Sequence, residues 1–474
     1  MTNTYVVEVI KALKPAERQE MAFFLDSPLY NKGGNSKELV RLYQVILNAS
    51  PEFSDNLLDK GKVYFDVFPD QKMVPGKLEK LMADLNKLLR VYCLTQQYFS
   101  ESKEDVQQVD WARWLRERGL SNRAHQLMVK LKPQEANDPK ESLDLHRTNL
   151  LIAEEVHLWE LNYNQAKGDL HIPDLIYCLD LYYHNYRTEL ANRYLLQQKA
   201  TELPVGDFFE TGVQVYQDTS ILLQISKKIF ELLKGDPPTG EDIQFLMELL
   251  SSHEESLSFE TLDHFYAYLR NFCTLVINAG YADFIPVLHQ INKDNLERGF
   301  LFFLGKIPPH AYLNLVQIAT RAKEYAWARK FTEDYKGMIV GGDEAEFFYR
   351  LNMAQCLFSL GQFEEALDYL PEASSNTHYH HIIRRLELKI YYELRSELLE
   401  YKLDAFRKFI ERTAPKSLAA NIRTMHLNFL KTLLQLSQSP MKDKDRSARL
   451  VKRIEEKKFV AERAWLMEKA RELG

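Results

Sequence analysis

Apolar residues recur along most of the chain at the spacing of one face of an α-helix. Between Leu78 and Tyr92 the apolar positions advance by 3, 1, 3, 3, 1 and 3 residues, which places them on one side of a helix. The same kind of pattern predicts helices over 105–118, 121–132, 140–165, 173–202 and 213–234. We therefore expect an all-α fold in which more than ~60% of the residues are helical.

Glycine and proline mark the internal boundaries of this helical pattern. The run GDPPTG at 235–240 follows Lys234 and supplies Gly235 as a candidate helix C-cap. Its length is normal for a connection between helices, so we do not expect a flexible linker. We predict an N-terminal helical region over 1–100, helical hairpins with long helices over 101–234, and shorter paired helices over 241–474.

An internal repeat lies in the last of these regions. The segment YLNLVQIA at 312–319 aligns with RLNMAQCL at 350–357, at an offset of 38 residues. The same offset pairs Ala328 with Ala366 in the helix that follows. A fixed period of this length is typical of helix pairs that stack in series.

The segment 347–380 resembles a tetratricopeptide repeat, in which small residues lie where two helices cross and an aromatic residue follows the turn. The matching positions are Ala354 and Leu357 on the first helix, Gly361 at the turn, Phe363 after it, and Ala366 and Ala373 on the second helix. The unit at 309–335 is similar but has Lys323 in place of the turn glycine. The resemblance implies a right-handed stack of antiparallel helix pairs, a TPR-like α-solenoid, that binds a protein or peptide on its concave surface.

The composition agrees with long helices and few turns, since only 18 of 474 residues are glycine and 17 are proline. The 67 acidic and 61 basic residues give a net charge of −6, which argues against a chain-wide surface for nucleic acid or anionic membrane. No apolar stretch is long enough to span a membrane. The cysteines Cys93, Cys178, Cys273 and Cys356 form no CxxC pair, and we expect buried free thiols in a cytoplasmic protein.

Enzyme signatures are absent from the sequence. It contains no phosphate-binding GxxxxGK[ST] loop, no GxGxxG, no GxSxG and no HExxH motif. The run His378-Tyr379-His380-His381 is interpreted as an exposed loop between helices rather than a metal site. We therefore expect a non-enzymatic protein with no catalytic residue, cofactor or metal.

Two groups of residues are candidates for partner binding. The first is a row of amides repeated at the 38-residue offset: Asn314 and Gln317, then Asn352 and Gln355. Residues three apart share a helix face, and amides can pair with the backbone of an extended peptide. The second group, Tyr182, Tyr186 and Arg187, lies in a tyrosine-rich helix; it either packs between helices or forms an amphipathic docking strip.

The segment 441–458 is locally basic, with eight lysines and arginines against four acids. A regulatory or nucleic-acid-associated protein that uses this segment is the alternative function. Leu450, Val451 and Ile454 give the same segment an apolar face, as expected for a helix that caps a repeat array with a polar outer surface.

Overall fold

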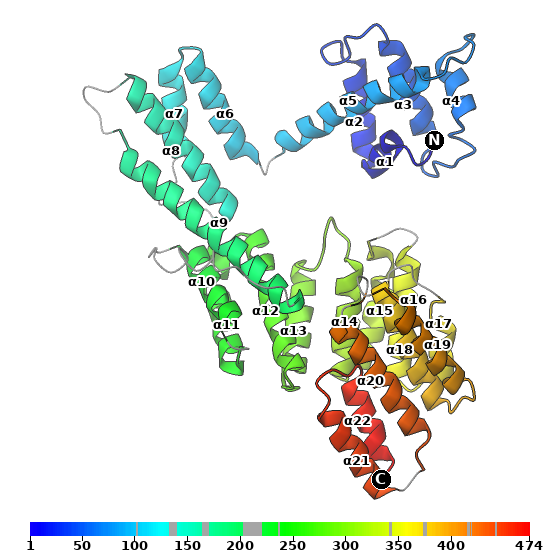
Figure 1. The fold of residues 1–474 in the computed structure, drawn as a ribbon. Coiled ribbons are helices and arrows are strands. Elements are labelled where there is room, and N and C mark those ends of the chain that lie inside the picture. The colour runs from blue at the N-terminus through cyan, green and yellow to red at the C-terminus, as the bar shows by residue number, and fades with distance from the viewer. Residues whose placement is uncertain are drawn as a thin grey trace. The chain divides into compact units, whose positions relative to one another are not determined.

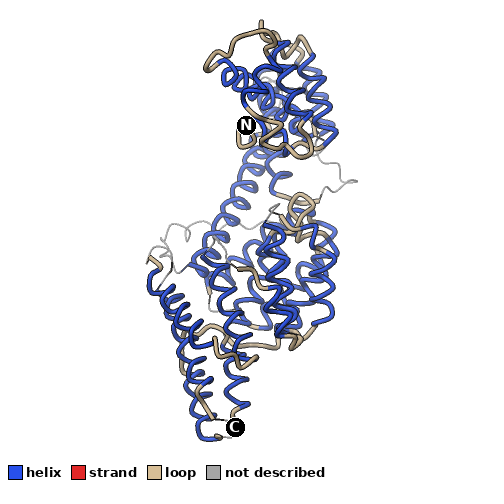
Figure 2. Tube along the Cα trace, turned by 90° about the vertical axis from the view of Figure 1, so that its right-hand side faces the viewer, coloured by secondary structure: helices blue, strands red, loops and turns tan. Residues whose placement is uncertain are grey.

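A computed structural model describes residues 1–474 except 101–102, 132–139, 164–169, 202–219, 236–237, 341–343, 373–376, 415–417, 419 and 441–442. The described residues are 76% helical and contain no strand, which confirms the predicted all-α fold (Figure 2). Extended backbone pairing among them is limited to isolated bridges, such as the one between Glu141 and Leu257.

The chain divides into two compact units, one of residues 1–139 and 143–186 and one of residues 140–142 and 187–474. The first, which we call the N-terminal unit, has two separate apolar cores: one from α1–α5 and one from α6–α8. Figure 1 labels the helices that form them. Its helices are α1 (Tyr5–Ala12), α2 (Pro15–Asp26), α3 (Ser36–Asn48), α4 (Lys60–Val67), α5 (Lys77–Tyr98), α6 (Glu104–Glu117), α7 (Ser121–Leu131), α8 (Leu143–Tyr163) and the first half of α9 (Ile172–Thr201).

The second unit, the C-terminal unit, is a series of helices in which sequence neighbours pack together. Its helices are the second half of α9, α10 (Ile221–Lys234), α11 (Gly240–Ser252), α12 (Phe259–Asn278), α13 (Phe284–Arg298), α14 (Pro309–Arg321), α15 (Tyr325–Asp334), α16 (Glu344–Ser359), α17 (Phe363–Tyr369), α18 (Thr377–Glu393), α19 (Leu399–Arg412), α20 (Ala420–Ser437), α21 (Lys444–Glu455) and α22 (Arg463–Glu472). The first helices of consecutive pairs, α14, α16 and α18, also pack side by side.

The predicted helix boundaries agree with local capping chemistry. Helix α10 ends at Lys234, and the N–H of Gly235 donates to Glu231 O, as the sequence suggests. Helix α11 begins with a capping box, because the side chain of Thr239 accepts from Asp242 N and the Asp242 carboxylate accepts from Thr239 N. The division into three regions at 100 and 234 stays a prediction.

The same turn ends the first helix of two aligned pairs. After α16, Gly361 takes a left-handed backbone conformation with φ of 77°, and the N–H of Gln362 donates to Leu357 O at 2.9 Å. After α14, Lys323 takes the same conformation with φ of 64°, and the N–H of Glu324 donates to Ala319 O at 2.9 Å. Both are Schellman turns, so the 38-residue alignment holds at the turn even where the glycine is replaced.

The alignment also holds in the core. Ala328 and Ala366 are both fully buried, as predicted for residues at helix crossings, and Leu313 and Leu351 are buried on the preceding helices. Small side chains let the two helices of a pair approach closely, so these alanines fix the packing distance. The C-terminal unit is therefore a series of packed helix pairs, compatible with a helical repeat. Ala373, another predicted crossing residue, lies outside the described residues.

Candidate partner-binding surfaces

The four amides predicted to form a row do not share one surface. Asn314 is exposed on α14, and Gln317 and Gln355 are half-buried. Asn352 is fully buried in α16, where its Nδ2 donates to Phe348 O at 2.8 Å. The expectation of one accessible row is wrong, because α16 packs against α14, α15, α17 and α18 and leaves no open face at Asn352.

The tyrosines of the second candidate group lie on α9. Tyr186 is exposed, Tyr182 is half-buried, and their rings stack at 5.9 Å between centroids. Arg187, the next residue, is half-buried. The structure therefore places the three residues together on one helix, and whether they bind a partner stays a prediction.

A longer apolar series on α9 was missed by the sequence analysis. Its members advance by 4, 3, 4 and 3 residues and are each 42–52% exposed; they are Ile172, Ile176, Leu179, Tyr183 and Tyr186, which we call the α9 strip. The same helix buries Leu181 and Asn185 on another side. A surface helix normally exposes polar residues to solvent, so this exposed stripe of large apolar side chains is unusual and is a candidate binding surface.

The histidine run at 378–381 forms the first turns of α18, so the prediction of an exposed loop is wrong. His381 is buried, and its ring stacks on that of His426 at 4.4 Å between centroids. Among the described residues no group of three His, Cys, Asp or Glu side chains could hold a metal ion.

The four cysteines form no disulfide in the structure. Cys273 and Cys356 are buried as predicted, whereas Cys93 and Cys178 are half-buried. Burial raises the pKa of the Cys273 thiol to about 12, so this group stays protonated and behaves as a small apolar side chain.

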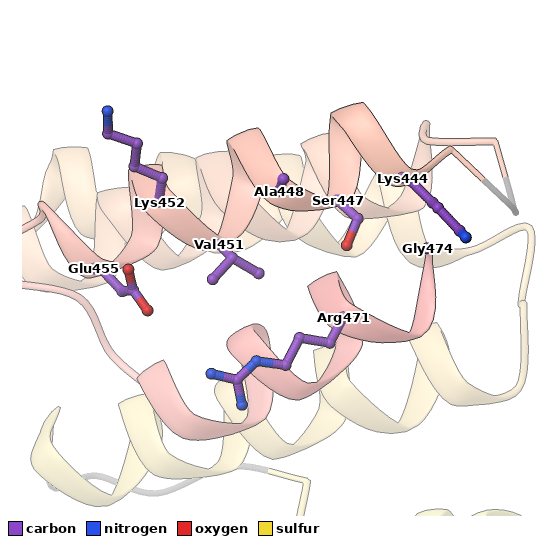
Figure 3. Close-up of a pocket in the computed structure, with 8 residues that line it drawn as sticks. All are labelled: Lys444, Ser447, Ala448, Val451, Lys452, Glu455, Arg471 and Gly474. Carbon is purple, nitrogen blue, oxygen red and sulfur yellow. The ribbon is translucent and has the colours of Figure 1, made fainter.

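Residues 444–455 of the basic segment form α21, which packs as an end helix. Leu450 and Ile454 are buried in the core of the last helices, which confirms the predicted apolar face. An open groove of about 760 Å³ lies between α21 and α22, and Figure 3 shows Arg471 extending into it toward Val451 and Glu455. Lys444 and Lys452 line the same groove, so its charges are mixed rather than uniformly basic.

One lysine of the segment is turned inward. Lys457 Nζ donates to Thr432 Oγ1 at 2.7 Å, and burial together with nearby Lys431 lowers its pKa. Its charge therefore serves the packing of the last helices rather than an outer basic surface.

A largely buried ion-pair cluster, which the sequence analysis missed, joins α18 to the start of α22. The Glu462 side chain in it is 25% exposed. The Glu462 carboxylate lies 2.8 Å from Lys389 Nζ and 3.2 Å from Arg385 Nε. Lys389 is only 5% exposed, and its ammonium also lies over the Phe358 ring, 4.7 Å from the centroid. Burial works to raise the pKa of Glu462, but the charges of Lys389, Arg385 and Arg321 outweigh it and hold the pKa at about 2.

The neighbouring Trp465 adds further contacts between α22 and α18. Its Nε1 donates to Glu393 Oε1 at 3.0 Å, and its ring lies edge-on to Tyr392 at 5.4 Å. The sequence signal for this cluster is Lys389 itself, a cation among the apolar residues Leu388 and Ile390 of a predicted helix. Its carboxylate partner, 73 residues later, has no signal in a single sequence.

No family model, curated protein or solved structure matches the chain. Within the described ranges no helix is long and apolar enough to cross a membrane. We therefore base the proposed function on the surfaces described above.

Proposed function

We propose that this protein is a non-enzymatic helical-repeat scaffold that binds an amphipathic helix of a partner protein along the α9 strip. The observation that carries the proposal is the spacing of the strip. Its five large apolar residues repeat every 3.5 residues on average and remain 42–52% exposed. That period is the seam of a helix that pairs with a second helix by knobs-into-holes packing.

The composition of the strip supports a protein partner. Two isoleucines and a leucine lie toward its start, and Tyr183 and Tyr186 lie at its end. Tyrosine offers a large apolar ring and a hydroxyl that tolerates water, which suits it to interfaces that form and dissociate. We expect the partner helix to carry an apolar seam of the same period.

The repeats of the C-terminal unit support the scaffold part of the proposal. Lys323 and Gly361 form the same turn, and Ala328 and Ala366 are equally buried. We propose that the pairs continue as a right-handed, TPR-like stack with a concave face, where exposed Asn314 is available to a second partner segment.

Nucleic-acid binding through 441–458 remains the alternative proposal. It predicts an affinity that falls steeply with salt and disappears when 441–474 is removed. The mixed charges of the groove and the inward position of Lys457 give it less support than the α9 strip has.

Photo-crosslinking with two matched variants tests the proposal. A benzoylphenylalanine at Leu179 is crosslinked in an extract of the source cells, and the captured peptide is identified by mass spectrometry. Tyr183→Glu changes the strip, whereas Tyr177→Glu changes a tyrosine of similar exposure on the same helix but off the strip. We expect one amphipathic helix to be captured, and the capture to be lost with Tyr183→Glu and kept with Tyr177→Glu.

Two results would overturn the proposal. Equal capture by both variants would show that the strip is not the binding surface. Crosslinks only to a second copy of this chain, with a dimer in sedimentation, would replace partner binding by self-association.

A further inference from the structure

A groove of about 730 Å³ lies between the second half of α9 and α12 in the C-terminal unit. Its volume is that of small-molecule sites. The described lining residues include Arg193, Lys199 and His264 but no Asp or Glu. Leu196 and Leu275 add apolar area to the same walls. The lining therefore combines basic groups with an apolar surface.

Tyr268 lines this groove and has an unsatisfied hydroxyl. The residue is 2% exposed, and its OH has no hydrogen-bond partner in the part of the chain that the structure describes. Burial raises the pKa of Tyr268 above its ordinary value, so the hydroxyl stays protonated and can donate. A buried donor without an acceptor costs free energy, and such a group in a native fold calls for an explanation.

A matched tyrosine in the same unit shows the usual arrangement. Tyr312 is fully buried, and its OH donates to Thr332 O at 2.6 Å. The two tyrosines have the same chemistry and nearly the same burial, and they differ in whether an acceptor is present. The acceptor for Tyr268 is therefore expected from outside the described fold.

A carboxylate behind the groove wall orients the basic groups. Glu189 Oε1 lies 2.5 Å from both Arg193 Nε and His264 Nε2. The ring of His264 stands edge-on to that of Tyr268, 5.0 Å away. Glu189 thus holds an arginine and a histidine beside the unpaired hydroxyl, while Asn271 adds an amide to the lining.

We propose that this groove binds a small organic acid, whose carboxylate accepts the hydrogen bond of Tyr268 and whose apolar body lies against Leu196 and Leu275. The Tyr268 hydroxyl is covered, so the carboxylate reaches it where the partly exposed His264 side chain turns aside. Lys199 of the lining balances the charge of the ligand, because Arg193 is already paired with Glu189. An oxygen acceptor suits the phenol, and a negative charge suits a lining that has bases and no acid. This site is independent of the α9 strip, so either proposal can fail without the other.

Fluorine NMR titration of the full chain with 4-fluorobenzoate tests the site. Neutral 4-fluorobenzamide has nearly the same shape and serves as the uncharged control, and inorganic phosphate serves as a competing anion without an apolar body. We expect saturable binding of the benzoate, weaker binding of the benzamide, and little competition by phosphate. Tyr268→Phe should weaken benzoate binding about tenfold, and the matched Tyr312→Phe should leave it unchanged.

Each other outcome contradicts the proposal. Absence of saturable benzoate binding in the millimolar range would remove the site. Equal affinity in wild type and Tyr268→Phe, with an unchanged circular dichroism spectrum, would show that the hydroxyl does not contact the ligand. Equal affinity for the benzamide would show that the site does not require a negative charge. Strong competition by phosphate would show that the site does not require an apolar body.

Discussion

Two buried polar clusters in the C-terminal unit use opposite arrangements. At the start of α22, the Glu462 carboxylate has Lys389 Nζ at 2.8 Å and Arg385 Nε at 3.2 Å. In the groove between α9 and α12, the Tyr268 hydroxyl is sealed from solvent and has no hydrogen-bond partner among the described residues, whereas the Glu462 side chain is 25% exposed. Each charge of the first cluster has a partner within the chain, and the second cluster lacks an acceptor within the described ranges.

The first cluster stabilises the fold, whereas the partner of the Tyr268 hydroxyl is, in our proposal, a ligand. A buried charge is tolerated when an opposite charge is fixed beside it. Removing either partner leaves the other charge buried and unpaired, which destabilises the fold. An unpaired neutral donor weakens the fold, and deleting it relieves that cost. Stability measurements on the two clusters should therefore change in opposite directions.

The largest effect is expected for Glu462→Gln. The substitution leaves Lys389, an ammonium that is 5% exposed, without its carboxylate partner. We expect the free energy of unfolding to fall by about 3 kcal/mol, measured by urea denaturation. The control is Glu456→Gln on an exposed pair with Lys452, where we expect a change within ~0.5 kcal/mol. Equal losses in the two variants would contradict the buried ion pair.

Acid should remove the same stabilisation in the wild type. The pKa of Glu462 is lowered from 4.5 to about 2 in the folded protein, so the unfolded chain binds this proton first. The contribution, about 3 kcal/mol by this shift, is complete above the unfolded pKa and is lost as the pH falls from 4.5 toward 2. The unfolding free energies of wild type and Glu462→Gln, measured by urea denaturation, should therefore approach each other as the pH falls below 4.5 and converge near pH 2. Parallel curves would show that Glu462 titrates normally.

The apolar helix crossing at Ala366 allows a comparison with the two polar clusters, because no polar side chain is changed there. Ala366→Leu inserts a larger side chain where the exposed fraction is zero, and overpacking should cost ~1–3 kcal/mol. Ala448→Leu, at an exposed position of α21, is the matched control and should leave the melting temperature nearly unchanged. An unchanged melting temperature for Ala366→Leu would mean that the crossing has room to expand.

Local features of this fold were predictable from the sequence, because short-range rules decide them. The turn at Gly361, the end of α10 at Lys234 and the burial of Ala366 follow from capping and small-residue patterns. The sequence placed Asn352 in an amide row for partner binding, and this was wrong. A repeat shows which residues share a helix face, but it does not show how many other helices cover that face.

Contacts distant in sequence were not predictable. Glu462 and Lys389 are 73 residues apart, and neither has a local pattern that points to the other. The α9 strip is visible as a 3.5-residue period that includes Tyr186, but a period does not tell which side of a helix the fold covers. The groove at Tyr268 depends on the packing of α9 beside α12, which a single sequence does not encode in any motif.

The smallest effects come from removing one hydroxyl at a time. Tyr312→Phe deletes the donor to Thr332 O and should cost ~1 kcal/mol of unfolding free energy, because the buried carbonyl loses its partner. Tyr268→Phe deletes a donor without an acceptor, so we expect no loss of stability, or a small gain. Urea denaturation of both variants in ligand-free buffer measures the difference, and both should keep the wild-type circular dichroism spectrum. An equal loss of unfolding free energy in Tyr268→Phe and Tyr312→Phe would show that an ordered water or another group already accepts from the Tyr268 hydroxyl. The groove would then have no free donor, and it would not differ from the Glu462 cluster in this respect.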